Sequence, residues 1–282
     1  MNDPGKFETE TPERSPAGIP LLGRNDHAEP SVFLPQSLLR EARRQKALPE
    51  AMVPPVCVLD PDGDLLQHVR RHLGATLSPH WACYHTQLWE WGSGADRYGI
   101  VGFVVGAPFA VLVAEQLFAC GCELLISISS AGQITDVGPP PYYVLIDRAL
   151  RDEGTSYHYL PPSTYANADP GLIELARAAV ANLRAKVYVG AAWTTDAPYR
   201  ETAQIIATRQ AQGVLAVEME SAGLYAFATA RRHPVICLAH VSNQLGRVEG
   251  DFEKGEGNGA NGSAELVKSL AGLRLRIAGS TR

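Results

Sequence analysis

Long apolar runs, an apolar leader segment and a surplus of positive charge are all missing from this sequence of 282 residues. No apolar run approaches the roughly 18 residues that a membrane-spanning helix needs, so no membrane partner is expected. The net charge of -5 offers none of the basic surface that attracts nucleic acid or anionic lipid. Residues 1–10 are polar and acidic, unlike a secretory signal, and a cytoplasmic location is therefore expected.

Paired cysteines are also absent, since none of the five forms a Cys-x-x-Cys motif. They are Cys57, Cys83, Cys120, Cys122 and Cys237. Four of them lie in apolar surroundings, which is typical of reduced core thiols in a cytoplasmic protein. Cys120 and Cys122 lack a second pair of ligands, so no metal site is predicted.

The first fifty residues differ from the rest in composition. Residues 1–31 are rich in proline, glycine and charge, which predicts a flexible extension. A short basic helix is predicted at Ser37–Lys46, and Pro49, Pro54 and Pro55 then interrupt the chain. We therefore divide the chain into an N-terminal extension, residues 1–50, partly flexible with a short helix, and one domain, residues 51–282.

Strands and helices alternate along residues 51–282. Short apolar runs predict strands at residues 56–59, 98–105, 124–129, 143–146, 187–193, 214–217 and 235–241. Helical patterns occur at residues 65–73, 110–119, 170–183, 202–212, 222–228 and 264–277. This order predicts an α/β fold with a mixed or mostly parallel sheet that helices cover on both faces. Residues 246–262 are rich in glycine and charge, which predicts a mobile loop, either a lid or a linker.

The most informative segment is Glu218-Met219-Glu220, where an apolar run meets a helical pattern. Ligands of open α/β sheets bind at the carboxyl ends of strands, so this junction is a candidate site. Buried carboxylates need hydrogen-bond donors, which the hydroxyl groups of a sugar would supply. The alternative is a helix N-terminus that the acidic residues stabilise.

Three further polar clusters follow predicted strands, and each also fits an ordinary turn or helix cap. Ser129, Ser130 and Gly132 offer hydroxyl and backbone N–H groups to a ligand oxygen. The loop at residues 194–202 brings an aromatic ring, a guanidinium and a carboxylate that can stack on and pair with a planar base. These residues are Tyr199, Arg200 and Glu201. Asn243 carries both a donor and an acceptor, which the lactam edge of a base requires.

The segment Asp60-Pro61-Asp62-Gly63-Asp64 suggests two other chemistries. It resembles the nucleophile motif of the haloacid dehalogenase-like phosphatases, in which one Asp attacks phosphorus and a second handles the proton. That family needs a later Asp pair for magnesium, and this sequence has no two adjacent aspartates. A calcium-binding EF-hand is excluded, because Gly63 stands at loop position four rather than six and Arg71 would stand at position twelve.

Together these segments resemble the nucleoside phosphorylase family, which contains uridine phosphorylase, purine nucleoside phosphorylase and the methylthioadenosine nucleosidases. The resemblance covers about residues 53–280 and is most specific at residues 218–222, which are similar to the uridine phosphorylase form. Supporting segments follow in the family's order at residues 130–132, 136–138, 151–159, 195–199 and 241–243. The resemblance implies one α/β domain with a central mixed, barrel-like sheet flanked by helices. It also implies a homo-oligomer, either a dimer or a trimer of dimers.

The resemblance assigns roles to individual residues. Glu220 would hold the ribose hydroxyls together with Glu218, and Met219 would pack beneath the sugar. Tyr199 and its neighbours would line the base, and Asn243 would hydrogen-bond the leaving base. Asparagine at that position favours an oxo-base such as uracil or hypoxanthine. The implied reaction cleaves the N-glycosidic bond of a small-molecule nucleoside without a bound cofactor, and inorganic phosphate is a possible co-substrate.

The sequence departs from the family where phosphorylases bind phosphate. The family's loop is Gly-Asp-Pro-x-Arg, and Leu59 and Gly63 here replace its glycine and its arginine. The positions of the two other family arginines fall at Ser127 and near Tyr84 or His85. A phosphate dianion prefers bidentate arginines. The three aspartates of this loop would instead repel it.

Two catalytic alternatives and one non-catalytic alternative follow. In phosphorolysis, phosphate binds through other groups, and the products are free base and ribose 1-phosphate. Candidates for this pocket, which holds phosphate or another nucleophile, are Ser130, Gly132, Asp60, Arg97, Arg200, Arg247 and an arginine of a neighbouring subunit. In hydrolysis, Asp62 or a neighbouring aspartate acts as the general base for water. Overall similarity favours phosphorolysis and local electrostatics favour hydrolysis, with Asn243, Glu220 and Asp62 as the catalytic set. The third alternative is a nucleoside-binding relative without turnover.

Overall fold

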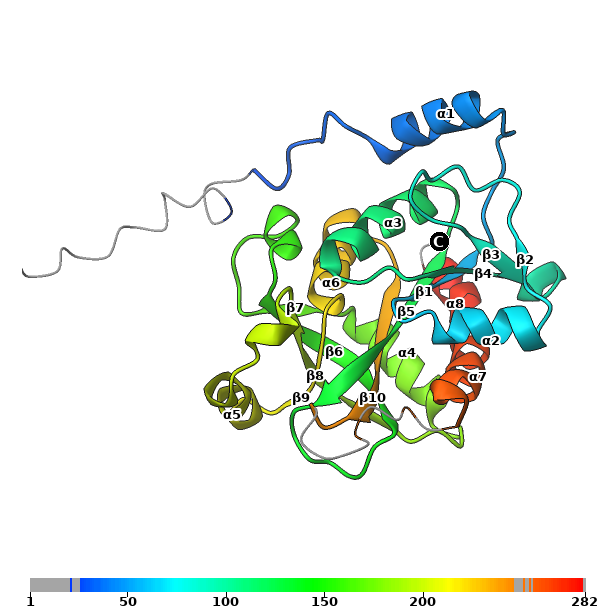
Figure 1. The fold of residues 1–282 in the computed structure, drawn as a ribbon. Helices are drawn as coiled ribbons and strands as arrows, with labels where there is room; N and C mark the ends of the chain where they lie inside the picture. Colours follow the sequence, from blue (N-terminus) through cyan, green and yellow to red (C-terminus); the bar gives the residue numbers. More distant parts are fainter. Residues whose placement is uncertain (1–20, 22–25, 246–250, 252–253, 255, 281–282) are drawn as a thin grey trace, which may run out of the picture.

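The computed structural model describes residues 26–245 and 256–280, together with residues 21, 251 and 254 (Figure 1). The strands are β1 Val56–Asp60, β2 Thr76–Leu77, β3 Trp89–Trp91, β4 Tyr98–Gly102, β5 Leu124–Gln133, β6 Tyr142–Asp152, β7 Tyr165–Asn167, β8 Val187–Thr195, β9 Val214–Glu218 and β10 Val235–Asn243. The α-helices are α1 Pro35–Lys46, α2 Asp64–His72, α3 Ala107–Ala119, α4 Pro170–Val180, α5 Ala203–Ala211, α6 Ser221–Arg231, α7 Ala260–Ala271 and α8 Leu273–Ser280.

Five strands close into a mixed barrel, in the order β5-β10-β6-β8-β9 and back to β5. Three of the five pairings are parallel, and two, β10–β6 and β5–β9, are antiparallel. Closure leaves these strands without an open edge, and their interior-facing side chains form a packed core. The predicted α/β fold with a central, barrel-like mixed sheet is therefore confirmed.

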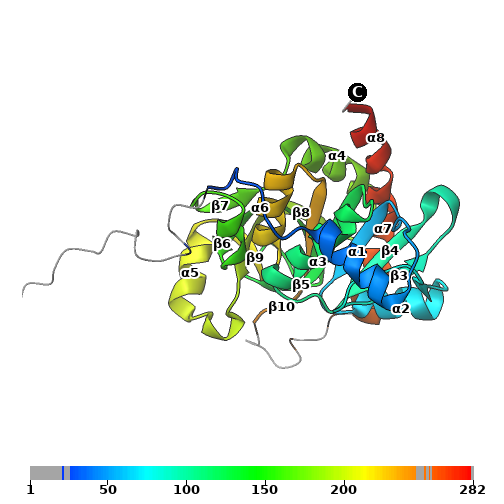
Figure 2. The same ribbon diagram turned by 90° about the horizontal axis from the view of Figure 1, so that it is seen from above.

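A second group of strands extends the sheet outward from β5. The strand β1 pairs parallel with both β5 and β4, and the short strands β3 and β2 continue this wing. Helices α1 and α3 lie on one side of the wing, and α2 and α7 lie on the other (Figures 1 and 2). Every residue of β1 is buried, as expected for a central parallel strand between two helical layers.

Several strands run further than the sequence predicts. The strand β5 continues to Gln133, so the cluster at residues 129–132 lies inside the strand and not in a turn after it. The strand β10 likewise includes Asn243. The strand β6 has eleven residues where four are predicted, because pairing with β7, β8 and β10 holds a segment that charged residues interrupt. The short strands β2, β3 and β7 carry no periodic signal and are not predicted.

The predicted N-terminal helix is present as α1, and it packs on α3. Leu39 and Ala42 form its buried face. Residues 1–20 and 22–25 of the predicted extension lie outside the described residues. All five cysteines are buried free thiols, as predicted for four of them. Among the described helices, none has the length and apolar character needed to cross a membrane.

Candidate active site

Three aspartates follow strand β1, and we call them the carboxylate loop: Asp60, Asp62 and Asp64. The turn that presents them depends on Gly63, whose φ of +80° favours glycine. A Cβ atom on Gly63 would lie 2.3 Å from Cε1 of Phe103, which packs against it. The family's arginine therefore has no room at this position unless Phe103 moves.

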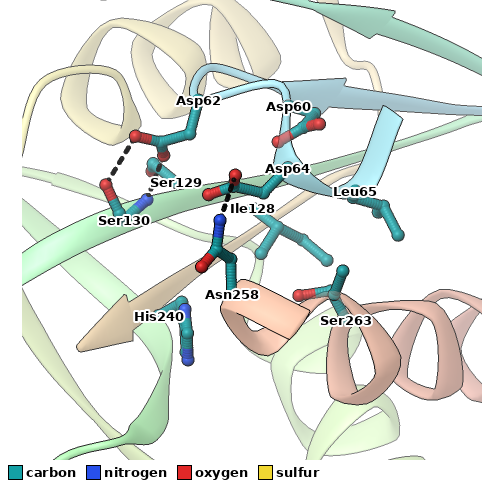
Figure 3. A pocket seen from close by; sticks show the side chains of 11 residues that line it. Asp60, Asp62, Asp64, Leu65, Ile128, Ser129, Ser130, His240, Asn258 and Ser263 are labelled. Atoms are coloured by element: carbon teal, nitrogen blue, oxygen red, sulfur yellow. Dashed lines mark hydrogen bonds between the residues drawn. The ribbon is translucent and has the colours of Figure 1, made fainter. Parts of the chain in front are cut away.

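Asp62 occupies the donors that the sequence assigned to an anionic ligand. The Ser130 N–H donates to Asp62 Oδ2 at 2.7 Å, and the Ser130 hydroxyl donates to Asp62 Oδ1 at 2.7 Å (Figure 3). Burial raises the pKa of Asp62, but these bonds and the nearby Lys254 ammonium outweigh burial and leave that pKa lowered. Asp62 is therefore an ionised carboxylate in the place expected for an oxyanion.

The other two aspartates of the loop differ from Asp62 in environment. Asp60 is buried and accepts a hydrogen bond from the Leu66 N–H at 2.7 Å. Burial, assisted by the charges of Asp62 and Asp64, raises the pKa of Asp60 to about 7. Asp64 opens helix α2 and binds Lys254 at 2.7 Å and Asn258 at 3.0 Å. The loop thus combines an ionised carboxylate with one that is half protonated near neutrality.

A small polar cavity of about 20 Å³ lies between the carboxylate loop, β5, β10 and the start of α7 (Figure 3). This volume is close to that of one water molecule. His240 on β10 lines the cavity and stacks on Tyr143, with ring centroids 4.7 Å apart. Burial lowers the pKa of His240 to about 4, so its ring is neutral at pH 7. Within the described part of the chain, no group of acidic, histidine or cysteine side chains is arranged to hold a metal ion.

The two glutamates of Glu218-Met219-Glu220 have different surroundings. Glu218 accepts hydrogen bonds from the Thr194 hydroxyl at 2.5 Å and from the Ser221 hydroxyl at 2.9 Å. It also accepts from the backbone N–H groups of Glu220 and Ser221, both at 2.8 Å. These four donors are protein groups, three at the start of α6 and one, Thr194, near the end of β8, so Glu218 acts as the helix-stabilising acid of the alternative prediction.

Glu220 retains more capacity to bind a ligand. Its Oε1 accepts the Gly106 N–H at 2.7 Å, and the Ser129 hydroxyl also bonds to this carboxyl. Burial first, and then the charge of Glu218, raise the pKa of Glu220 to about 8. Glu220 and Asp62 are thus anchored on consecutive residues of β5, Ser129 and Ser130, while Met219 between the glutamates is half-buried.

The loop after β8 places only one of its three predicted residues in a protected position. Tyr199 is fully exposed and Arg200 is exposed. Glu201 is partly buried, which raises its pKa to about 7, and the described residues give its carboxyl no hydrogen bond. Thr202 caps helix α5 through the Ile205 N–H at 3.3 Å. Glu201 is therefore the member of this group with an unpaired acceptor.

Asn243 is part of strand β10 and pairs with Gly132 of β5. Its Nδ2 donates to the Ala131 carbonyl at 3.3 Å, and its Oδ1 accepts the Leu245 N–H at 3.0 Å. A Cβ atom on Gly132 would lie 2.1 Å from Leu245 Cδ2. The lack of a side chain at residue 132 thus lets the chain after β10 pack closely over β5.

Lys254, Asn258 and His240 belong to the site, although the sequence did not single them out as site residues. Asp251, Lys254 and residues 256–262 are the described part of the predicted mobile loop, and residues 246–250, 252–253 and 255 lie outside the described residues. Within this part, the short helix η6, Glu256–Gly259, leads into α7. One signal was available in the sequence, since a lone lysine in a glycine-rich segment is a natural partner for an aspartate cluster.

Comparison of the chain with other proteins identifies its family. A family described as the phosphorylase superfamily matches residues 55–271, and the protein belongs to it. The purine nucleoside phosphorylase of Colwellia psychrerythraea is 28% identical over 151 residues, which cover 53% of this chain and 64% of that protein. The guanosine phosphorylase of Halorubrum lacusprofundi is 28% identical over 165 residues, 57% of this chain and 64% of the relative. The chain thus matches slightly less than two thirds of the length of these curated relatives.

Solved structures share the fold. Uridine phosphorylase from Vibrio fischeri superimposes with a TM-score of 0.66 at 21% identity, covering 78% of this chain and 91% of its own. AMP nucleosidase from Bacteroides thetaiotaomicron superimposes with a TM-score of 0.68 at 18% identity, covering 87% and 99%. The fold is therefore the one used by nucleoside phosphorylases and nucleosidases.

Proposed function

We propose that this protein cleaves the N-glycosidic bond of a ribonucleoside with water, not phosphate, as the nucleophile. The observation that carries the proposal is the paired hydrogen bond from Ser130 to Asp62. A phosphate bound at Ser130 would compete with a carboxylate that already accepts both donors at 2.7 Å.

The rest of the phosphate pocket supports the same conclusion. The carboxylate loop brings acidic side chains to this point, where a phosphorylase needs cations. The positive φ of Gly63 and its contact with the Phe103 ring both disfavour the family's arginine at this position. Ser127, at a second arginine position, is buried, and its hydroxyl has no hydrogen-bond partner.

The chemistry needs a base for water, a fixed sugar and a stabilised leaving group. In the proposed step, Asp62 takes a proton from water, the water oxygen bonds to the anomeric carbon, and the bond between that carbon and the base breaks. The bonding electrons move onto the base, which Asn243 stabilises with a hydrogen bond and which then takes a proton from solvent water. Glu220 accepts hydrogen bonds from the ribose hydroxyls and fixes the sugar for in-line attack. The products are free base and ribose.

The proposed substrates are nucleosides of oxo-bases, either 6-oxopurines or uracil. Asn243 and Glu201 together offer a donor and acceptors, which complement a lactam carbonyl and its N–H. Among the relatives, the names guanosine phosphorylase and uridine phosphorylase agree with this range.

Phosphorolysis to ribose 1-phosphate is the second candidate function. It is favoured by the names of the curated relatives, which are phosphorylases, and by the Ser130 donors, which could receive phosphate if Asp62 turned away.

We also propose a homo-oligomer. Exposed apolar side chains lie near the start of α1 and before α3, where a second copy could cover them. They are Val32, Phe33, Phe103 and Val105.

A panel of ribonucleosides, incubated with the protein in phosphate-free buffer, tests this function. We expect release of hypoxanthine, guanine or uracil together with free ribose. Asp62→Asn, which removes the general base, should lower the rate about 100-fold or more. Release that begins only after phosphate is added would support phosphorolysis. No release from any nucleoside, with or without phosphate, would support a binding protein without turnover.

A further inference from the structure

Lys254 is the cation that the structure brings to the carboxylate loop. Its ammonium nitrogen lies 2.7 Å from Asp64 Oδ2 and 3.2 Å from Asp62 Oδ1. The side chain is mostly buried, with 24% of its surface exposed, so solvent screens these contacts less than it screens a surface ion pair. Lys254 is distant in sequence from β1 and reaches the loop from the segment before α7.

Contacts that do not involve Lys254 itself hold the segment that carries it against the site. Asn258 Nδ2 donates to Asp64 Oδ1 at 3.0 Å. The Tyr143 hydroxyl donates to the Gly259 carbonyl at 2.8 Å. Gly259 has a φ of +74°, and a Cβ atom there would lie 2.2 Å from the His240 ring. These contacts fix where η6 lies over the barrel, and they place Lys254 beside the aspartates.

The charge balance around Asp62 depends on this one lysine. Asp60 and Asp64 are acidic neighbours, and both favour the protonated form of Asp62. His240, on the opposite wall of the cavity, is neutral at pH 7 because burial lowers its pKa to about 4. Ser130 supplies two neutral donors. Among the described residues that face this cluster, Lys254 alone carries a positive charge.

We propose that Lys254 is a positioning residue, which holds Asp62 ionised and in place at Ser130 so that Asp62 can activate water. The inference rests on the proposed hydrolytic function. It assigns to the segment before α7 a role in setting the protonation state of Asp62, the general base. It also explains how three aspartates can share a turn beside the reacting atoms.

The sign of the effect follows from the charges. With Lys254 present, the pKa of Asp62 is lowered, so kcat should stay level as the pH falls to about 5. Without Lys254, only the Ser130 hydrogen bonds oppose the effect of burial, so the pKa of Asp62 should rise. The acid limb of the kcat profile should then move to higher pH, by about one unit or more.

The test compares Lys254→Met with Lys254→Arg, which keeps the charge, and with Lys186→Met, which removes an equal charge before β8. The profile of kcat against pH is measured for each, since kcat reports groups in the enzyme–substrate complex. In parallel, carbon NMR of aspartate-labelled protein follows the Asp62 carboxyl resonance, assigned with Asp62→Asn. This second measurement needs no turnover, so it gives a result even where the proposed function fails.

We expect Lys254→Met to shift both the acid limb of kcat and the Asp62 titration to higher pH. Lys254→Arg, which keeps the charge, should stay close to the wild type in both measurements. Lys186→Met should match the wild type. An unshifted Asp62 titration in folded Lys254→Met would overturn the inference. If the wild type turns over no nucleoside and the Asp62 titration is still shifted in Lys254→Met, the hydrolytic function is overturned and only the electrostatic role of Lys254 remains.

Discussion

At the Glu220 carboxyl, burial and the charge of Glu218 raise the pKa to about 8, so the empty site holds this group mostly protonated at pH 7. Two ribose hydroxyls that donate to it would favour the carboxylate instead. If Glu220 holds the ribose as proposed, binding of the sugar is coupled to loss of a proton from this buried acid.

A pH profile of kcat/KM tests this assignment, because kcat/KM reports the groups of the free enzyme. We expect kcat/KM to rise with pH and to level off above about pH 8, since only the carboxylate accepts from both hydroxyls. Glu220→Gln should lower kcat/KM about 10- to 100-fold and remove this rise. A wild-type profile that is flat from about pH 6 to about pH 9 would contradict the role of Glu220.

Glu201 gives a second prediction at the residue scale, because its partly buried carboxyl has no described partner. If it accepts the lactam N–H, the wild type should prefer inosine to 1-methylinosine, which lacks that N–H. Glu201→Ala should reduce this preference about 10- to 100-fold. Glu174→Gln, which changes an exposed carboxylate on α4, is the control. An unchanged preference in Glu201→Ala would remove Glu201 from the base site.

At the element scale, the turn between β1 and α2 presents the carboxylate loop, on which the proposed use of water in place of phosphate rests. Gly63 and Phe103 pack against each other there. Gly63→Ala should lower the free energy of unfolding by about 1–3 kcal/mol, through the positive φ and the contact with Phe103. In the double variant with Phe103→Ala, the contact is relieved and only the backbone cost of about 1 kcal/mol should remain. Urea denaturation measures Gly63→Ala, Phe103→Ala and the double variant, and strictly additive effects would show that the contact is unimportant.

The helices and the apolar strands were predictable because local periodicity encodes them. The buried strands β1, β9 and most of β10 are uninterrupted apolar runs, and their predicted bounds agree closely with the structure. The strand β6 was shortened in the prediction because Asp147 and Arg148 interrupt its pattern, and only pairing with three other strands specifies its full length. Closure of the barrel likewise depends on contacts between distant segments, and family resemblance supplied what periodicity could not.

The site was predictable as a set of strand ends but not as a set of bonds. Spacing alone placed Glu218 and Glu220 together, yet the structure gives Glu218 four protein donors and leaves Glu220 the freer of the two. The sequence also set the carboxylate loop against phosphate. It could not show that Asp62 reaches Ser130, because that contact joins residues 68 positions apart.

At the scale of the whole molecule, helix α1 joins the N-terminal segment to the domain. Leu39 is 1% exposed and packs in the main core, and Lys46 donates to the carbonyls of Ala82 and Cys83 at 2.9 and 2.7 Å. Leu39→Ala should lower the free energy of unfolding by about 2–4 kcal/mol. Arg40→Ala, on the exposed face of the same helix, should change it by no more than about 0.5 kcal/mol. Equal, small effects of both changes would show that α1 is only loosely attached.

At this scale the closed barrel supplies β5, β9 and β10 to the proposed site, the wing supplies β1, and the segment before α7 supplies the cation. We propose that the nucleophile is water that Asp62 activates. The proposal rests on the Ser130 donors, which phosphate would need and which the protein's own carboxylate holds.

The most direct test is the identity of the sugar released when the wild type turns over its best nucleoside in buffer with abundant phosphate. Products are separated and the sugar is identified by phosphorus and carbon NMR. We predict free ribose with no ribose 1-phosphate, and a rate that does not depend on phosphate concentration. Ribose 1-phosphate as the main product would contradict the account and would mean that Asp62 yields Ser130 to phosphate during turnover.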